Sequence, residues 1–355
     1  MKTIHIAFLI ALTIAYLVTP FVIKLATRVG AIDVPKDNRR VHTVPIPRLG
    51  GIAIFIGFMV AVLVTFRMDT RLVSVLAGGV VIVTLGYFDD IKPLSAKVKL
   101  LVQILAAAIV IYGGVKINMV TNPLSYILEG ADPYIRLGLW SYPLTLVWIV
   151  GVTNAINFID GLDGLAAGVS IIAALTLTVV AIFLDQSYIA LLAATLAGST
   201  IGFLPYNFNP AKIFMGDTGS MFLGYMLSVL AVMGVVKSAA ALSILVPIFA
   251  IGLPIFDTFM AIIRRSLSGK SVMEADKGHM HHKLLDIGLS HKQAVLTMYS
   301  VSAILGFSAV ALVEANLKVA VILVLAVFFL ASLGVKYLGL IKTKTKAKTN
   351  NNINL

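Results

Sequence analysis

Long uninterrupted blocks of apolar residues restrict the folding of this chain more than any other feature. A helix rises about 1.5 Å per residue, so roughly 20 apolar residues cross the hydrocarbon core of a bilayer. Eleven such blocks can be identified, at residues 4–26, 50–67, 72–88, 98–114, 141–157, 165–184, 188–205, 218–236, 239–263, 293–313 and 318–340. We therefore predict an all-α polytopic membrane protein with about eleven transmembrane helices.

The composition excludes several other classes of protein. The chain is 59% hydrophobic and only 12% charged, whereas soluble domains are about 45–50% apolar and about 25% charged. An ordinary soluble globule, a disordered chain and a nucleic-acid-binding domain are therefore excluded, and the expected partner is the lipid bilayer. The absence of cysteine also excludes disulfides and thiolate metal sites.

The distribution of positive charge predicts the orientation in the membrane. The net charge is +12, and most lysines and arginines outside the spans fall in the loop after the first span and in every second loop thereafter. The positive-inside rule places these loops in the cytoplasm. We expect an outside N-terminus, one transmembrane domain over residues 1–341, and a disordered cytoplasmic tail over 342–355. The outside loop at 115–140 is expected to form a short hairpin.

Carboxylates gather in three segments that this topology places at the same membrane face. Asp89 and Asp90 close the third span, and Asp217 lies in NFNPAKIFMGDTGS before the eighth. Asp160 and Asp163 lie in NAINFIDGLDGLAAG at the end of the fifth span. Magnesium bound to nucleotide phosphates takes a few hard oxygen ligands and leaves positions for water and substrate. These segments therefore predict a metal-assisted phosphate site at the cytoplasmic mouth.

Each acidic segment also has a structural interpretation. The pair 89–90 fits a solvated helix end, although carboxylates at a helix C-terminus face the negative end of its dipole. Aspartate and glycine are turn residues, so the fifth helix is expected to break near Gly161. The polar residues of 216–220 are suited to cap the eighth helix. Structural and functional roles remain open at this point.

A histidine-rich segment lies between the ninth and tenth spans. His279, His281 and His282 stand beside Lys277 in the stretch 264–292. Imidazoles can donate to phosphate or transfer protons. Their spacing does not fit a helical zinc site, so zinc is not expected. A solvated basic loop is the alternative interpretation.

Two further features are candidates for function. The first is RRVHTVPIPRLGG, in which Arg39, His42 and Arg48 could meet phosphates, or could be ordinary cytoplasmic charges. Its two glycines allow close approach of a ligand or helix. The second is Asp257, which lies within the ninth span. A charge at mid-bilayer costs about 2.5–3.5 kcal/mol, so Asp257 is either functional or a buried hydrogen-bond partner.

Together these segments resemble the polyprenyl-phosphate N-acetylhexosamine-1-phosphate transferase family, within glycosyltransferase family 4. The resemblance covers about residues 28 to 292. It is carried by VHTVPIPRLGG, the aspartate pair with its lysine-containing loop, NAINFIDGLDGL, FNPAKIFMGDTGS and DKGHMHHKLL. The order of these segments and their common side of the membrane make the joint match specific.

The resemblance implies a reaction. The family transfers a sugar 1-phosphate from a UDP-sugar to a lipid phosphate and releases UMP, with Mg²⁺ as cofactor and Mn²⁺ as an alternative ion. In this chain Met280 interrupts the three consecutive histidines typical of the phospho-MurNAc-pentapeptide transferases. The resemblance therefore favours UDP-GlcNAc and undecaprenyl phosphate as substrates, at the first membrane step of a surface polysaccharide or teichoic acid pathway. The pentapeptide transferase, more remotely a transporter, and a homodimer remain open.

The resemblance also assigns roles to residues. It makes Asp217 the leading metal ligand and puts Asp89 and Asp90 in the metal and lipid-phosphate region, at the cytoplasmic face of the cell membrane. The expected catalytic residues are Asp89, Asp90, Asp160, Asp163, His281 and His282. The expected substrate-binding residues are Arg39, His42, Arg48, Lys92, Lys97, Lys99, Asn154, Asn157, Asn209 and His279. Which of the three lysines meets phosphate is open, and so is a covalent aspartyl-phosphate route.

Overall fold

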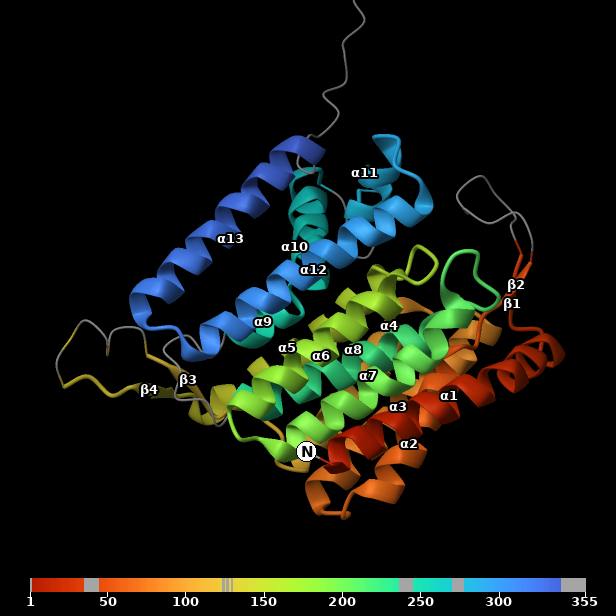
Figure 1. Cartoon of the computed structure of the whole chain (residues 1–355), viewed down its shortest axis with the longest axis horizontal. Helices are drawn as coiled ribbons and strands as arrows, with labels where there is room; N and C mark the ends of the chain where they lie inside the picture. Colours follow the sequence, from red (N-terminus) through yellow and green to blue (C-terminus); the bar gives the residue numbers. More distant parts are fainter. Residues whose placement is uncertain are drawn as a thin grey trace, which may run out of the picture.

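The chain folds into a bundle of long helices with a small hairpin at each end (Figure 1). The computed structural model describes residues 2–34, 45–122, 125, 128, 130–235, 245–269 and 278–339. The helices of the N-terminal half are α1 (Lys2–Arg28), α2 (Gly51–Thr65), α3 (Thr70–Ile91), α4 (Ala96–Tyr112), the 3₁₀ helix η2 (Gly138–Trp140), α5 (Ser141–Phe158) and α6 (Leu165–Phe183). Those that follow are α7 (Ser187–Asn207), α8 (Gly216–Val235), α9 (Leu245–Ala250), α10 (Gly252–Leu267), α11 (Met280–Asp286), α12 (His291–Glu314) and α13 (Leu317–Leu338).

The helices bear out the predicted fold class. Among the described residues, eight helical segments are long and apolar enough to cross a membrane, and α2 is a shorter apolar helix. Ten of the eleven predicted spans each coincide with a single helix. The protein is therefore an all-α polytopic membrane protein, while the number of spans and the sides of the two termini stay predictions.

The ninth predicted span, 239–263, is wrong as a single helix. Its described part is divided into α9 and α10, which meet at Ile251. Pro254 has no amide hydrogen to donate to the carbonyl of Ala250, and its ring would clash with that carbonyl. Gly252 further weakens helical continuity at the junction. An apolar block thus predicts membrane burial, but it does not predict an unbroken helix.

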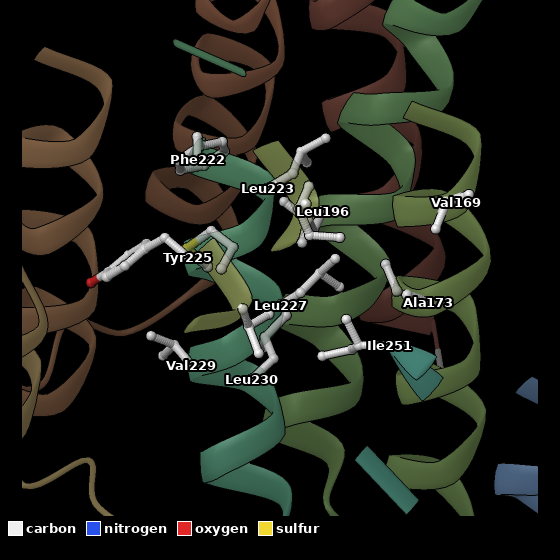
Figure 2. Close-up of a cluster of buried hydrophobic side chains, with 14 of the residues drawn as sticks. Val169, Ala173, Leu196, Phe222, Leu223, Tyr225, Leu227, Val229, Leu230 and Ile251 are labelled. Atoms are coloured by element: carbon white, nitrogen blue, oxygen red, sulfur yellow. The ribbon is translucent and has the colours of Figure 1, made fainter. Parts of the chain in front are cut away.

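Helix α8 is the centre of the bundle. In the most apolar stretch of α8, 89% of the residues are buried, whereas 6% are buried in that of the peripheral helix α13. Helix α8 packs against α3 and α5, and also against α2, α6 and α7. Figure 2 shows Leu223 and Leu227 of α8 in a buried cluster that also includes Leu196 of α7 and Ala173 of α6. This packing holds α8, and with it the acidic segment at its N-terminus, in a fixed position.

Glycines allow the neighbouring backbones to touch α8. A Cβ atom added at Gly86 of α3 would lie 2.3 Å from Thr218 Cα, and one at Gly51 of α2 would lie 2.1 Å from Gly219 N. No side chain fits at these crossings, because the obstacle is backbone. The predicted close approach of a neighbouring helix at the glycine pair 50–51 is thereby confirmed. The ends of α2 and α3 are pressed onto the start of α8.

We expect Gly86→Ala to destabilise the protein. Overpacking a well-packed site costs about 1–3 kcal/mol, and occasionally more, and here the backbone of Thr218 would have to move. Thermal unfolding in detergent should therefore show a lowered Tm for Gly86→Ala. Gly79→Ala on the same helix is the control, because its Cβ would meet Phe222 Cε2 at an ordinary 3.4 Å. Equal Tm values for the two variants would contradict the described crossing.

Short strands hold the loop before α2 and the loop before α8 together at one end of the bundle. Strand β1 (Ile32–Asp33) pairs with β2 (Ile46–Pro47). The chain from the end of β2 to the start of α2 pairs with the segment before α8. Phe214 N donates to Pro47 O at 2.8 Å, and Gly51 N donates to Met215 O at 2.9 Å. The segment PIPRLGG therefore lies alongside IFMGD.

The second hairpin lies in the predicted outside loop. Strand β3 (Met119–Thr121) pairs antiparallel with β4 (Tyr134–Arg136). The expectation of a short hairpin between residues 115 and 140 is therefore confirmed. The hairpin lies at the end of the bundle away from β1 and β2 (Figure 1), so it is remote from the acidic segments.

Candidate active site

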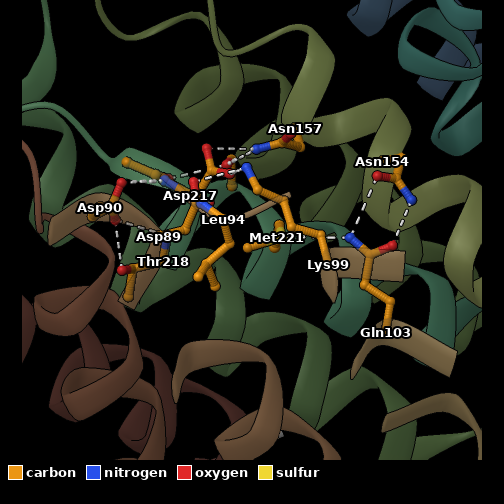
Figure 3. A network of polar contacts seen from close by, with 12 residues as sticks. Asp89, Asp90, Leu94, Lys99, Gln103, Asn154, Asn157, Asp217, Thr218 and Met221 are labelled. Carbon is orange, nitrogen blue, oxygen red and sulfur yellow. Dashed lines mark hydrogen bonds and ion pairs between the residues drawn. The ribbon is translucent and has the colours of Figure 1, made fainter. Parts of the chain in front are cut away.

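A network of polar side chains lies where α3 and α5 end and where α4 and α8 begin (Figure 3). Its centre is Lys99, near the start of α4. The ammonium Nζ lies 2.7 Å from Asp89 Oδ2 and 2.7 Å from Asp217 Oδ2. One cation thus bridges two carboxylates that are remote in the sequence. The side chains of Lys99 and Asp217 remain 27% and 25% exposed, so a ligand can reach them.

Asn157 and Leu94 complete the hydrogen bonds of this carboxylate pair. The amide Nδ2 of Asn157 donates to Asp217 Oδ1 at 3.1 Å and to Ser220 Oγ at 2.8 Å. The backbone N–H of Leu94 donates to Asp89 Oδ1 at 2.7 Å. The two carboxylates are therefore oriented before any ligand arrives. Preorganised charges of this kind are what phosphoryl transfer requires.

Asp90 points away from its neighbour and caps α8. Its Oδ1 accepts from Asp217 N at 2.9 Å, and its Oδ2 accepts from Thr218 N at 3.0 Å and from Thr218 Oγ1 at 2.6 Å. A carboxylate at a helix N-terminus satisfies orphan amides and complements the dipole. The cap of α8 therefore comes from α3, and not from the residues 216–220, which the sequence offered as one interpretation.

Arg48 binds the C-terminal end of α3, next to the start of α8. Its Nε donates to the backbone carbonyl of Asp90 at 2.9 Å, at the C-terminal end of α3. Cations near a helix C-terminus are favourable because the last carbonyls carry partial negative charge. The PIPRLGG segment thus contributes a positive charge next to the acidic pair. Arg39 and His42, from the same predicted motif, lie outside the described residues.

The turn between α5 and α6 carries Asp160. Helix α5 ends at Phe158 and α6 begins at Leu165, so the predicted break near Gly161 is confirmed. Asp160 is half-buried, and burial together with the charges of Asp217, Asp90 and Asp163 raises its pKa to about 8. The Asp160 carboxyl is therefore largely protonated near neutral pH, and a cation bound beside it would favour its charged form.

Asp163 braces the turn. Its Oδ2 accepts from Asn209 Nδ2 at 2.9 Å and from Ala211 N at 3.1 Å. Its backbone N–H donates to His291 Nε2, at the start of α12, at 2.9 Å. The turn is thus tied both to the loop before α8 and to α12. Asp163 and Asn209 contact each other, and their predicted catalytic and substrate-binding roles stay predictions.

The histidine segment packs onto the same turn. A Cβ atom at Gly161 would lie 2.4 Å from His281 Nε2, so the imidazole rests directly on the turn. The rings of His281 and His282 have centroids 4.2 Å apart. Burial, with the nearby charge of His282, lowers the pKa of His281 to about 3. His281 is therefore neutral at physiological pH.

The structure separates the predicted lysines and amides by position. Lys99 lies in the network, whereas Lys92 and Lys97 are exposed. Asn154 lies one turn below Asn157 and exchanges hydrogen bonds with Gln103 at 2.7 and 3.3 Å. Of the three lysines, Lys99 is the one that lies in the network, and its role toward phosphate stays a prediction.

Sequence reasoning missed Gln103 and the hydroxyl groups of Thr218 and Ser220. Gln103 follows Lys99 by four residues, so both lie on one face of α4. A polar amide at that spacing in an apolar helix was a signal that could have identified Gln103. The sequence identified the residues 216–220 only as possible caps of α8, whereas Thr218 Oγ1 donates to Asp90 and Ser220 Oγ accepts from Asn157.

The carboxylate oxygens of the network are suited to bind magnesium. Within the described residues, no three histidine, aspartate or glutamate side chains are grouped to hold a metal ion. Mg²⁺ usually binds through one or two carboxylates and fills its other positions with water and substrate phosphate. Asp217 and Asp89 already share one cation and supply such oxygens. The oxygens of Asp90 are engaged by the start of α8, which makes Asp90 the weakest of the three predicted ligands.

Comparisons with known proteins show which chains are similar to this one. Residues 72–235, which span α3 to α8, match the family model described as glycosyl transferase family 4. The chain is 42% identical over 350 residues to a probable undecaprenyl-phosphate N-acetylglucosaminyl 1-phosphate transferase of Bacillus subtilis, covering 98% of this chain and 96% of that protein.

Other relatives are more distant. A decaprenyl-phosphate N-acetylglucosaminephosphotransferase of Mycolicibacterium smegmatis is 38% identical over 329 residues, which is 85% of this chain and 80% of that protein. A phospho-N-acetylmuramoyl-pentapeptide-transferase of Desulforudis audaxviator is 33% identical over 322 residues, covering 84% and 94%.

Proposed function

Because the chain belongs to glycosyl transferase family 4, we propose that it transfers GlcNAc-1-phosphate from UDP-GlcNAc to undecaprenyl phosphate and releases UMP. The observation that carries this proposal is the pair of carboxylates bridged by Lys99 at the ends of membrane helices. The pair offers oxygens for a metal on a diphosphate, and Lys99 offers a charge for phosphate. The family predicted from the motifs is the family to which the chain belongs.

The relatives support the choice of donor. Two relatives named for N-acetylglucosamine share 42% and 38% identity with the chain, whereas a pentapeptide transferase shares 33%. This order favours UDP-GlcNAc as the donor and undecaprenyl phosphate as the acceptor. The product, undecaprenyl-diphospho-GlcNAc, would enter a surface polysaccharide or teichoic acid pathway.

The position of the site suits both substrates. The lipid tail of the acceptor stays in the bilayer, while the nucleotide sugar is soluble in water. A site at the ends of α3 and α5 lies where both can arrive. We place this end at the cytoplasmic face, because the loops that carry the motifs also carry most of the basic residues outside the spans.

The proposed chemistry is a displacement at phosphorus. An oxygen of the lipid phosphate forms a bond to the sugar-bearing phosphorus, and the bond from that phosphorus to the oxygen of UMP breaks. The second pKa of a phosphate monoester is near 6, so the acceptor is largely dianionic at neutral pH and needs little help from a general base. We therefore favour direct transfer over an aspartyl-phosphate intermediate.

The residues of the network position and neutralise charge. Lys99 is placed to offset phosphate charge, and Asn157 orients the Asp217 carboxylate. Asp90 fixes the N-terminus of α8, from which Asp217 projects. We propose that Asp217 and Asp89 hold Mg²⁺, which when bound neutralises charge on the diphosphate. Positioning and electrostatic stabilisation supply most of the rate enhancement in phosphoryl transfer.

A test of donor choice separates this proposal from its nearest alternative. Purified protein in detergent receives undecaprenyl phosphate, Mg²⁺ and either UDP-GlcNAc or UDP-MurNAc-pentapeptide, and labelled sugar is counted in the butanol-extractable lipid. We expect labelled lipid from UDP-GlcNAc alone. Lipid formed only from the pentapeptide donor would move the protein to peptidoglycan synthesis. No lipid from either donor, with a control enzyme active, would contradict the proposal.

A further inference from the structure

Asp257 is a buried carboxylate that the proposed chemistry does not use. It lies in α10 and is 1% exposed. Both of its oxygens are engaged by the segment that precedes and begins α11. His279 Nδ1 lies 2.9 Å from Asp257 Oδ2, and Met280 N donates to Asp257 Oδ1 at 2.8 Å. Of the two roles that the sequence left open, the structure thus shows a buried hydrogen-bond partner.

The contact with Asp257 fixes the start of α11. Met280 is the first residue of that helix, so its N–H has no acceptor within α11. The side chain of His279, which precedes the helix, makes no capping bond. Asp257 therefore supplies the missing acceptor from another helix, where a carboxylate is also favoured by the dipole.

His279 connects Asp257 to the candidate active site through its ring contacts. Its ring is parallel to that of His281, with centroids 5.9 Å apart and an interplanar angle of 8°. The ring of His279 also lies 6.2 Å from that of Phe158, the last residue of α5. His281 in turn rests on Gly161, next to Asp160. A continuous set of contacts thus joins Asp257 to the turn beside the carboxylate network.

The Asp257 carboxylate at Nδ1 also selects the tautomer of the His279 imidazole. It retains a proton on Nδ1 and holds the ring in one orientation, as it does for histidines that bind metals or take part in catalysis. An asparagine at the same position could donate to Nδ1 and so favour the opposite tautomer. Asp257 therefore controls both the placement and the hydrogen-bonding character of His279.

We propose that Asp257 is a positioning residue, which fixes His279 and the start of α11 against the 159–164 turn and thereby sets the affinity for the nucleotide-sugar donor. The link to the donor rests on the proposed function. The histidine segment lies outside the long apolar helices, and under the proposed function it faces the side from which the water-soluble donor arrives. The lipid acceptor reaches the site through the bilayer, so its affinity should not depend on this contact.

The kinetic test compares Asp257→Asn and His279→Ala with Thr258→Val, a neighbouring change on the same helix. Loss of the carboxylate that orients a metal-ligating histidine typically costs about 10–100-fold in affinity or activity, and we expect the low end of that range here. We expect the KM for UDP-GlcNAc to rise about 10-fold in both variants, with the KM for undecaprenyl phosphate unchanged. The double variant should be no worse than the more affected single variant. Additive losses, an unchanged donor KM, or equal rises in both KM values would overturn the proposal.

Hydrogen exchange tests the contact without any turnover. In the protein without substrates, Asp257→Asn and Asp257→Leu should speed amide exchange in residues 278–286, and Thr258→Val should not. Unchanged exchange in a folded Asp257 variant would overturn the proposed anchoring. Should both Asp257 variants fail to fold, exchange in His279→Ala decides from the other side of the contact. A wild type that releases no UMP would sink the proposed function, while the exchange result still decides the anchoring.

Discussion

Asp217→Asn should lower kcat by about 100- to 1,000-fold at saturating Mg²⁺, as commonly follows the loss of a preorganised charge at a reacting centre. Asparagine preserves the shape of the side chain but removes one of the two charges that share Lys99. It also replaces a carboxylate oxygen with an amide nitrogen, which is not a ligand for Mg²⁺. The measurement is the rate of UMP release with both substrates saturating.

Two comparisons make the Asp217 result specific. Asp286→Asn changes an exposed carboxylate at the end of α11 and should leave kcat near that of the wild type. The Tm of Asp217→Asn should stay close to that of the wild type, because Asp90 holds α8 through backbone amides that the substitution keeps. Near-wild-type turnover of a folded Asp217→Asn protein would refute the metal-ligand assignment.

Lys99→Gln should lower kcat by about 100-fold or more, because it removes the one charge that bridges Asp89 and Asp217. In the absence of Mg²⁺, the carboxylates of Asp89 and Asp217 would then face each other without the ammonium between them. Lys99→Arg should not restore activity, because a planar guanidinium cannot replace a compact ammonium between two oxygens at 2.7 Å. The measurement is again kcat for UMP release, alongside the Tm.

Lys97→Gln is the matched control for Lys99. Lys97 lies two residues earlier in α4, is exposed, and loses the same charge on substitution. We expect Lys97→Gln to retain kcat within about twofold, because exposed charges of this kind are screened by solvent. Equal losses in the Lys97 and Lys99 variants would mean that general basicity matters, and not the bridge.

The outline of this fold was predictable from the sequence because lipid restricts the backbone to few solutions. Apolar blocks of sufficient length have to be helices, and ten predicted spans coincide with single helices. The prediction of the ninth span failed at Ile251, which Gly252 and Pro254 closely follow, whereas a proline without a glycine two positions earlier did not interrupt α1 or α7. Local backbone chemistry thus decided the one place where the apolar pattern was misleading.

The division of work between Asp89 and Asp90 was not predictable from their sequence. Adjacent residues on a helix point about 100° apart, so one can face the lysine and the other the next helix. Which one does so depends on where α8 crosses α3, and that crossing is set by Gly86. The partners of Asp90 lie 127 and 128 positions away in the chain.

Which of the three lysines faces the network could not be predicted from the sequence either. Lys92, Lys97 and Lys99 all follow the aspartate pair, and spacing alone did not rank them. The start of α4, where the side chain of Ser95 accepts from Val98 N, fixes the helical phase of the residues that follow. That phase turns Lys99 toward the network and leaves Lys97 exposed. The residue types were therefore predictable, but their directions required the packed bundle.

The fate of the donor's β-phosphorus tests the central claim most directly. Purified protein in detergent would receive undecaprenyl phosphate, Mg²⁺ and UDP-GlcNAc labelled with ³²P at the β-phosphorus, which carries the sugar. Transfer of a sugar 1-phosphate predicts that the label enters the butanol-extractable lipid and that unlabelled UMP accumulates in equal amount. Label that remains in water-soluble UDP, with sugar in the lipid, would show transfer of the sugar alone and contradict the account.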